Sequence, residues 1–181
     1  MSRRRENMIK VSVIYGPGDA ERRLLKRAIW VTMGRTEDPG TLPRPDLVRK
    51  VLRARHSPIR VLNFAFLIEG IPSNTSVHLC RHVHAVPFVS SLRNDRQDKM
   101  DGDAARRDTP VDMILYCNAE ELMVIANKRL CAKAAERTRT VVRMMCEAAT
   151  WAVPELEGLL VPMCEHCGGV CHEIESCGRW D

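Results

Sequence analysis

Residues 61–69 have the sequence Val61-Leu62-Asn63-Phe64-Ala65-Phe66-Leu67-Ile68-Glu69, which is the strongest strand pattern in the chain. Large hydrophobic, aromatic and β-branched residues dominate it, and such residues favour the pleated surface of a sheet. Gly70 follows directly and is expected to end the strand. A second strand is expected over residues 8–15, where hydrophobic and polar residues alternate until Gly16-Pro17-Gly18 breaks the pattern.

Helical patterns account for much of the remaining chain. Helices are expected over residues 19–33, 46–55, 72–83, 119–131 and 133–152. Asp19 can cap the first of them, and Pro45 suits the first turn of the second. The fourth begins at a capping box, in which the Asn118 side chain accepts from a first-turn amide and Glu121 reaches back to the cap. Two helices are expected after Asn118 in preference to one unbroken rod.

Together these elements predict an α+β fold with a small mixed or antiparallel sheet and about five helices. The 181 residues suffice for one compact domain and are too few for two full ones. We place this domain at residues 1–162 and a Cys- and His-rich C-terminal tail at residues 163–181. No window approaches the ~18 uninterrupted apolar residues of a membrane span. The basic N-terminus precedes too short an apolar run for a signal peptide, so a cytoplasmic protein is expected.

The cysteines are concentrated near the C-terminus. Four of the 8 fall in the last 18 residues, at Cys164, Cys167, Cys171 and Cys177, with His166 and His172 between them. In a reducing cytoplasm such thiols can surround a zinc ion, or three of them can hold part of an iron–sulfur cluster. The spacing lacks the paired C-x2-C pattern of the strongest zinc motifs, so a reduced or redox-labile tail packed on the domain is the alternative. The other cysteines lie in apolar contexts and are expected to be core thiols: Cys80, Cys117, Cys131 and Cys146.

The basic residues are mostly arginine, with 22 Arg against 6 Lys and a net charge of +5. Arginine binds phosphate and carboxylate groups bidentately, whereas a general compositional bias would place it on solvated faces without a function. Residues 81–93, RHVHAVPFVSSLR, are expected to form a helix end and a turn that present two Arg, two His and two Ser. Such a group suits a phosphate-bearing ligand, and an ordinary surface helix end is the alternative. Residues 93–108 carry many charges and are expected to form a solvated or ligand-ordered loop.

The segment also resembles a family signature. Arg81-His82-Val83, seven further residues, then Ser91 and Arg93 keep the frame of the R-H-R…S-x-R motif of the flavin-dependent thymidylate synthases. Flanking stretches resemble the family's S-P-x-E-H, F-x-F-x-I-x-G, A-R-x-x-L-P and N-A-R-E-L motifs in the same order, at residues 57–58, 64–70, 105–110 and 118–122. The resemblance extends over about residues 46–178.

This resemblance implies a homotetramer with active sites at subunit interfaces that converts dUMP to dTMP. It implies FAD as cofactor, with NADPH and methylenetetrahydrofolate as co-substrates, and reduced flavin as the relay for the one-carbon unit. Arg129 matches the catalytic arginine that polarises the pyrimidine ring. The positions matching nucleotide-binding residues are His78, Arg81, Ser91, Arg93 and Arg106, and those matching flavin-contacting residues are Ser57, Arg81, His82 and Asn118.

Most departures from the family motifs fall at positions that the resemblance assigns to flavin binding. Val83 replaces the second arginine of R-H-R, and Val89 replaces the acid two residues before Ser91. The family's Glu in S-P-x-E-H is Arg60, and its Arg in N-A-R is Glu120. A homologue that acts on another pyrimidine nucleotide, or a nucleotide-binding protein without catalysis, is therefore an alternative. A basic metal- or nucleic-acid-binding module is a further alternative, although only 4% of the residues are aromatic and able to stack on bases.

Overall fold

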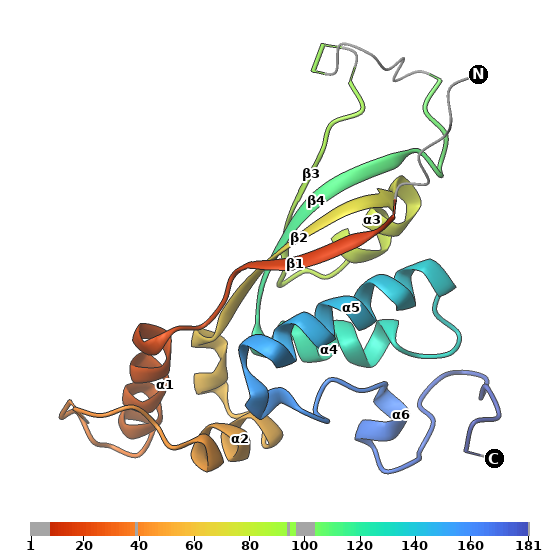
Figure 1. Ribbon diagram of the computed structural model, residues 1–181. Helices are drawn as coiled ribbons and strands as arrows, with labels where there is room; N and C mark the ends of the chain where they lie inside the picture. The colour runs from red at the N-terminus through yellow and green to blue at the C-terminus, as the bar shows by residue number, and fades with distance from the viewer. Residues whose placement is uncertain (1–7, 39, 94, 97–103, 181) are drawn as a thin grey trace.

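The centre of the molecule is a four-stranded antiparallel sheet built on the strand that the sequence marks most strongly. The computed structural model describes residues 8–38, 40–93, 95–96 and 104–180 (Figure 1). Strand β2 (Asn63–Pro72) pairs with β1 (Lys10–Tyr15) on one side and with β4 (Pro110–Asn118) on the other. Strand β3 (Val86–Val89) pairs with β4 and completes the order β1-β2-β4-β3.

Gly70 lies within β2 and does not end it, so the expected strand boundary is wrong. The β2–β4 register shifts between Ile68 and Ile71, and Gly70 has a φ of 68°, a value that favours glycine. The Gly70 amide donates to Asp112 Oδ1 at 2.8 Å. A bulge therefore bends the strand here and lets pairing continue to Pro72.

All five expected helices are present, with bounds shifted by a few residues. They are α1 (Asp19–Thr32), α2 (Pro45–Arg53), α3 (Ser73–Cys80), α4 (Ala119–Arg129) and α5 (Glu136–Ala152). The residue that caps α1 is Gly18, not Asp19. The sequence patterns missed β3, β4, the short helix α6 (Met163–His166) and two 3-10 turns, η1 (Ser57–Val61) and η2 (Pro154–Leu156). The predicted α+β class is confirmed.

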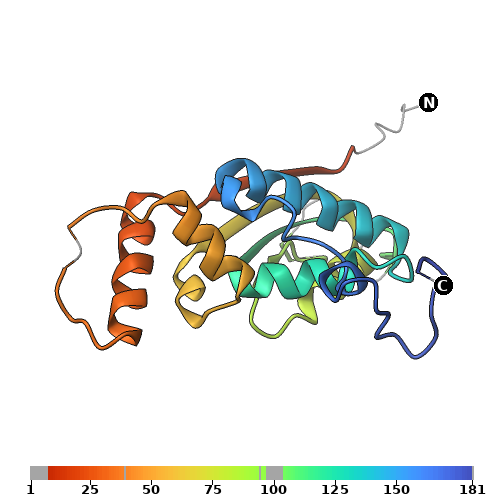
Figure 2. The ribbon, with the colours of Figure 1, turned by 90° about the horizontal axis from the view of Figure 1, so that it is seen from below.

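The helices α3, α4 and α5 cover one face of the sheet (Figures 1 and 2). Alternate residues of β4 point to this face, where Met113 and Leu115 are buried. Phe64 and Phe66 of β2 are fully buried beside them. Side chains of α1 and α2 belong to the same continuous hydrophobic cluster, so the layers form a single core.

The other face of the sheet has no helix over it in the described part of the chain (Figure 1). By the strand register, Val86, Phe88 and Tyr116 share this face, and all three are exposed. In the described part of the chain, no helix is long and apolar enough to cross a membrane. The N-terminal residues 1–7 and residues 94 and 97–103 of the expected charged loop lie outside the described residues.

Candidate functional site

Arg129 contacts two other predicted site residues, His78 and His82. It is the last residue of α4, and its Nε donates to His82 Nε2 at 3.0 Å. Its Nη2 donates to the carbonyl oxygen of His78 in α3 at 2.8 Å. The C-terminal ends of α3 and α4 thus meet at one guanidinium group, whose position is set by two bonds from different nitrogens.

His82 lies between Arg129 and a buried carboxylate. Its side chain is 7% exposed, and its Nδ1 lies 3.3 Å from Oε1 of Glu121, which is 4% exposed. Because a guanidinium can only donate, His82 Nε2 must accept and the ring proton belongs on Nδ1, facing Glu121. Burial, together with the charge of Arg129, lowers the pKa of His82 to about 4. The imidazole is therefore neutral at pH 7.

Glu121 is a site residue that the sequence does not reveal, because its position in a capping box already explains it. Half of that box is present: Asn118 Oδ1 accepts from the Glu121 amide at 2.9 Å. The Glu121 side chain contacts His82 instead of returning to the cap. Burial raises the pKa of this carboxyl. No local signal in the sequence links Glu121 to His82, because the two residues are 39 positions apart.

Two further residues complete this group. His78 Nδ1 is 2.8 Å from Oγ1 of Thr138, a buried residue of α5, so α5 also supports the site. Arg81 is exposed just beyond α3, and its charge adds to burial in lowering the pKa of Arg129. Two guanidinium groups close enough to interact make this end of α3 favourable for an anion.

The second predicted group lies at the opposite end of α3. The Ser73 hydroxyl and the Asn74 amide donate to the carbonyl oxygen of Arg107, at 2.9 and 3.0 Å, so Arg106 and Arg107 lie at the start of this helix. An eight-residue helix is ~12 Å long. Arg106 and Arg129 are therefore separated by the length of α3 within one chain.

The arginines of this second group are open to solvent. Arg93 donates from Nε and Nη2 to the carboxylate of Asp95, at 2.9 and 2.8 Å, and its side chain is 67% exposed. Arg106 Nε lies 3.4 Å from Asp108 Oδ1. Ser91 is half-buried on the same connection after β3. An anion that displaced Asp95 and Asp108 could bind both Arg93 and Arg106. Within a single chain, however, these two arginines lie far from Arg129.

Of the four expected flavin-contacting residues, two have exposed side chains and two have side chains that are buried or hydrogen-bonded within the protein. Ser57 and Arg81 are exposed, whereas His82 is buried and Asn118 caps α4. Ser57 begins η1, and Asn118 ends β4, where it pairs with Asn63 at the start of β2. Exposed hydroxyl and guanidinium donors have the chemistry that the pyrophosphate of FAD requires. The donor set therefore fits the phosphate part of FAD.

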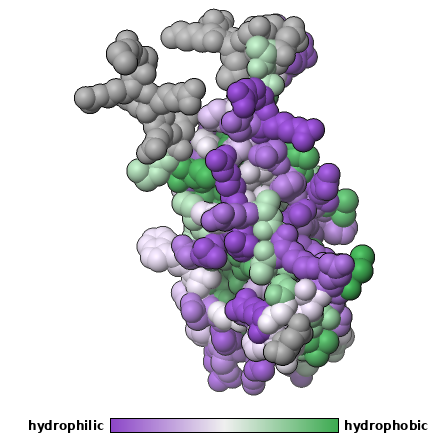
Figure 3. All heavy atoms as spheres, turned by 90° about the vertical axis from the view of Figure 1, so that its right-hand side faces the viewer, coloured by the Kyte–Doolittle hydropathy of each residue, from purple (hydrophilic) through white to green (hydrophobic). Residues whose placement is uncertain are grey.

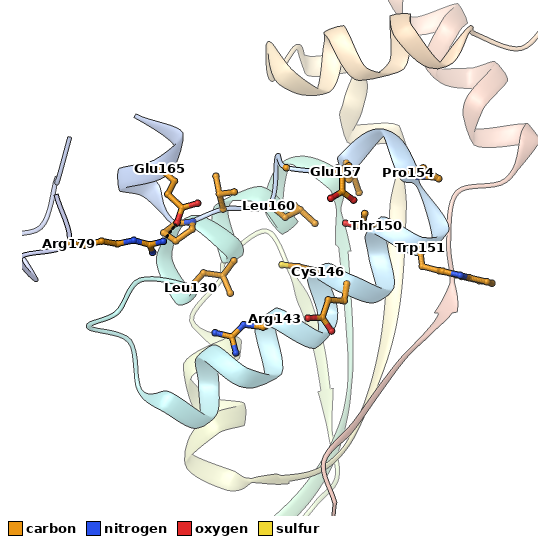
Figure 4. A pocket seen from close by; sticks show the side chains of 15 residues that line it. Leu130, Arg143, Cys146, Thr150, Trp151, Pro154, Glu157, Leu160, Glu165 and Arg179 are labelled. Atoms are coloured by element: carbon orange, nitrogen blue, oxygen red, sulfur yellow. Dashed lines mark ion pairs between the residues drawn. The ribbon is translucent and has the colours of Figure 1, made fainter. Parts of the chain in front are cut away.

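A hollow of about 910 Å³ lies away from these residues. It runs between α5 and residues 154–165, with Cys146 and Trp151 on its α5 side (Figure 4). Glu165 and Arg179 close one end through an ion pair of 2.5 Å. None of the predicted site residues lines it.

The C-terminal cysteines do not form the expected set. Among the described residues, no three His, Cys, Asp or Glu side chains are arranged to hold a metal ion. The Cys167 thiol instead contacts the sulfur of Met163 at 3.7 Å. Cys117 and Cys146 are buried as predicted, and burial raises the pKa of each to about 12. The expectation of core thiols is wrong for Cys80, which is exposed, and Cys131, which is only half-buried.

No family model and no curated protein matches the sequence, but solved structures match the fold. Thymidylate Synthase X (ThyX) from Helicobacter pylori, solved with FAD and dUMP, is 15% identical with a TM-score of 0.65, over 84% of this chain and 97% of its own. The UMP/dUMP methylase PolB from Streptomyces cacaoi, bound with 5-Br dUMP, is 16% identical with a TM-score of 0.66, over 84% and 94%. Another Helicobacter pylori structure, of flavin dependent thymidylate synthase ThyX with FAD and dUMP, is 16% identical with a TM-score of 0.61, over 77% and 93%. This chain therefore has the fold of the flavin-dependent thymidylate synthases, in a divergent form.

Proposed function

We propose that this protein methylates a pyrimidine nucleoside monophosphate, dUMP or a close relative, as a divergent flavin-dependent thymidylate synthase. The observation that carries the proposal is the position of Arg129, which two bonds fix beside Arg81 and the neutral His82. The solved structures of the same fold contain dUMP or its 5-bromo analogue. The proposed cofactor is FAD, and the proposed co-substrates are NADPH and methylenetetrahydrofolate. We also propose that the protein is cytoplasmic.

Arg129 can polarise a pyrimidine ring, because among the described residues its two hydrogen bonds use Nε and Nη2 and neither uses Nη1. A permanent cation stabilises the negative charge that develops on the ring oxygens as C5 becomes nucleophilic. His82 holds the guanidinium in place without adding a positive charge of its own, and Glu121 faces the proton on His82 Nδ1. Bound FAD would supply the redox chemistry that carries the one-carbon unit to C5.

The nucleotide phosphate is the proposed ligand of Ser91, Arg93 and Arg106. These residues lie at the far end of α3 from Arg129, so we propose that a second copy of the chain contributes them to the site. The open face of the sheet supports association, since its exposed hydrophobic side chains include Val86, Phe88 and Tyr116. A homotetramer with active sites shared between subunits would account both for the distance of these residues from Arg129 and for the exposed hydrophobic face of the sheet.

A nucleotide-binding protein without methyl transfer is a second candidate. Its specific support is Val83, which is 85% exposed and offers no polar group where the family has an arginine. Binding of dUMP without turnover would favour this candidate.

The test is a tritium-release assay with 5-tritiated dUMP in the presence of FAD, NADPH and methylenetetrahydrofolate, run in parallel with UMP. We expect release from one of the two nucleotides and a loss of at least about 100-fold in Arg129→Ala, the scale of removing one oriented electrostatic group. Arg137→Ala is the matched control, because Arg137 is exposed on α5. No release and no nucleotide binding by the folded protein would refute the proposed function.

A further inference from the structure

Helix α2 ends on an arginine whose backbone is strained. Arg55 has a φ of 49°, and among the described residues it is the one residue other than glycine with a positive φ. Its amide donates to the Leu52 carbonyl at 3.0 Å, and the His56 amide donates to the Val51 carbonyl at 3.1 Å. These two bonds form the left-handed helix ending at which glycine is the usual residue. An arginine there carries a backbone strain that glycine would not, so we looked for a use of its side chain.

The Arg55 guanidinium is half-buried and has no ion-pair partner among the described residues. Its Nη2 donates to Oδ1 of Asn127, which is 1% exposed and whose Nδ2 donates to the Val161 carbonyl at 2.6 Å. This fixed amide orients the guanidinium, while Nε and Nη1 have no hydrogen bond within the described part of the chain. Burial lowers the pKa of Arg55, and the charge of Glu120 opposes this from a carboxylate that Arg60 already binds. A partly desolvated cation without a partner favours an anion beside it.

Arg55 lines a cavity of about 250 Å³ between the end of α2, α4 and the segment after η2. Arg53 and His166 line it as well. Burial, together with the charge of Arg55, lowers the pKa of His166, so its imidazole is neutral at pH 7 and has one N–H to donate. The acidic residue of the lining is Glu165, whose carboxylate pairs with Arg179 at 2.5 Å. The lining therefore carries two positive charges, and its negative charge is already neutralised.

We propose that this cavity binds a phosphate group, either as inorganic phosphate or at the end of a small phosphorylated molecule. A phosphate with a charge of about −2 matches the two positive charges of Arg53 and Arg55, and its oxygens can accept from both guanidinium groups and from His166. A carboxylate would leave one of these charges uncompensated. None of the residues proposed above for nucleotide or flavin binding lines the cavity, so the site does not depend on the proposed function.

The size and the surroundings of the cavity suit a polar ligand. A volume of about 250 Å³ holds several water molecules, so the space for a phosphate group is already present. His166 is exposed, and no described residue after Pro162 is buried, so this wall of the cavity is open to water. On the side of the molecule that carries the tail, hydrophilic side chains predominate and hydrophobic ones form separate small areas (Figure 3). A charged ligand can therefore approach without crossing an apolar surface.

The test follows the side-chain amide of Asn127 by NMR, because this amide contacts Arg55 directly. Titration of the full chain with inorganic phosphate at constant ionic strength should shift its resonances to saturation, whereas chloride should not. Arg55→Gly should weaken phosphate binding at least about tenfold, as loss of one charge-assisted partner does. The matched control Lys50→Ala removes an exposed cation of α2 outside the cavity lining and should bind as wild type. Equal affinity in wild type and Arg55→Gly would overturn the proposal.

Thermal unfolding separates this role from a purely structural one. Glycine relieves the backbone strain at position 55, so without phosphate Arg55→Gly should be about as stable as wild type, and phosphate should raise the Tm of wild type alone. Arg55→Asn also suits the left-handed region and lacks the charge, so it serves as a second variant if Arg55→Gly folds poorly. A large loss of stability in both variants, with no effect of phosphate on the wild-type Tm, would show that Arg55 is kept only for its bond to Asn127.

Two further titrations identify the source of the phosphate and the independence of the site. Tighter binding of ribose 5-phosphate than of inorganic phosphate would identify a phosphorylated molecule as the ligand, and weaker or equal binding would identify the free ion. Excess FAD and dUMP should leave the response of Asn127 to phosphate unchanged. Loss of that response with FAD would assign the cavity to the cofactor, and no response of the wild-type protein to either phosphate ligand would refute the site.

Discussion

Arg60 and Glu120 form an ion pair between Nε and Oε2, although they lie on different elements, η1 and α4. Each of them departs from the family motif that its segment resembles, and each carries the charge that the motif has at the other position. The two departures are therefore complementary in charge, and in this chain they form one ion pair between η1, which begins at Ser57, and α4, which Asn118 caps.

Reversing one of these charges should destabilise the protein, and reversing both should restore it. Arg60→Glu or Glu120→Arg alone places like charges side by side, and we expect each to lower the free energy of unfolding slightly, because the pair is partly exposed. The double exchange should recover most of this loss in urea unfolding. It should also bind FAD more tightly than wild type, since it restores the family's charges. Additive losses in the double variant would show that the two residues do not interact.

Removing the Arg129 cation should raise the pKa of His82. Burial is the larger cause of the low value of about 4, and the nearby guanidinium adds to it. In Arg129→Ala we expect the pKa to rise while staying below 6.5, the ordinary value, because burial remains. Titration of the imidazole Cε1 resonance by NMR measures this, and Arg137→Ala should leave the curve in place. An unchanged pKa in Arg129→Ala would contradict the contact.

The neutral state of His82 predicts a loss of stability in mild acid. The unfolded chain takes up a proton on this histidine near pH 6.5, and the folded protein only near pH 4, so stability falls as the pH drops through that range. The slope is at most about 1.4 kcal/mol per pH unit. Glu121 opposes it, because its raised pKa favours the folded state at low pH. Comparing wild type with His82→Gln isolates the histidine: the difference in unfolding free energy should change between pH 6.5 and 4 and stay constant above pH 7.

Glu155 joins α1 to the segment after α5 and should stabilise the fold at neutral pH. Arg22 donates to both of its carboxylate oxygens, at 2.6 and 3.0 Å, and this interaction lowers the pKa of Glu155. Glu155→Gln should cost about 2–3 kcal/mol at pH 7, because both side chains are largely buried. Since the folded pKa lies below the unfolded one, the difference should begin to shrink as the pH falls below about 4.5 and be lost only once the pH passes below the lowered pKa of the folded state. Glu157→Gln, at an exposed position two residues on, is the control and should have little effect.

Local patterns were sufficient for the helices α1 to α5 and for the strands β1 and β2, whereas α6, β3 and β4 were not predicted. Periodicity, Asn118 as a cap and Pro45 at a first turn are properties of a few neighbouring residues, so they can be recognised without the fold. Strand β3 could not be recognised in this way. It is four residues long and contains Pro87, and it exists because β4 offers it a free edge more than twenty residues later in the chain.

The same distinction applies to the candidate site, where some residues could be identified from the sequence and others only from the structure. The sequence by itself identified Arg129, His78 and His82, because a motif frame records which residue types stand at which spacing. Only the tertiary structure could show that Glu121 faces His82 and that Arg60 pairs with Glu120. These two contacts join residues that lie 39 and 60 positions apart. Spacing along the chain carries no information about such contacts, because the packing of α4 against η1 and against the segment after α3 sets them.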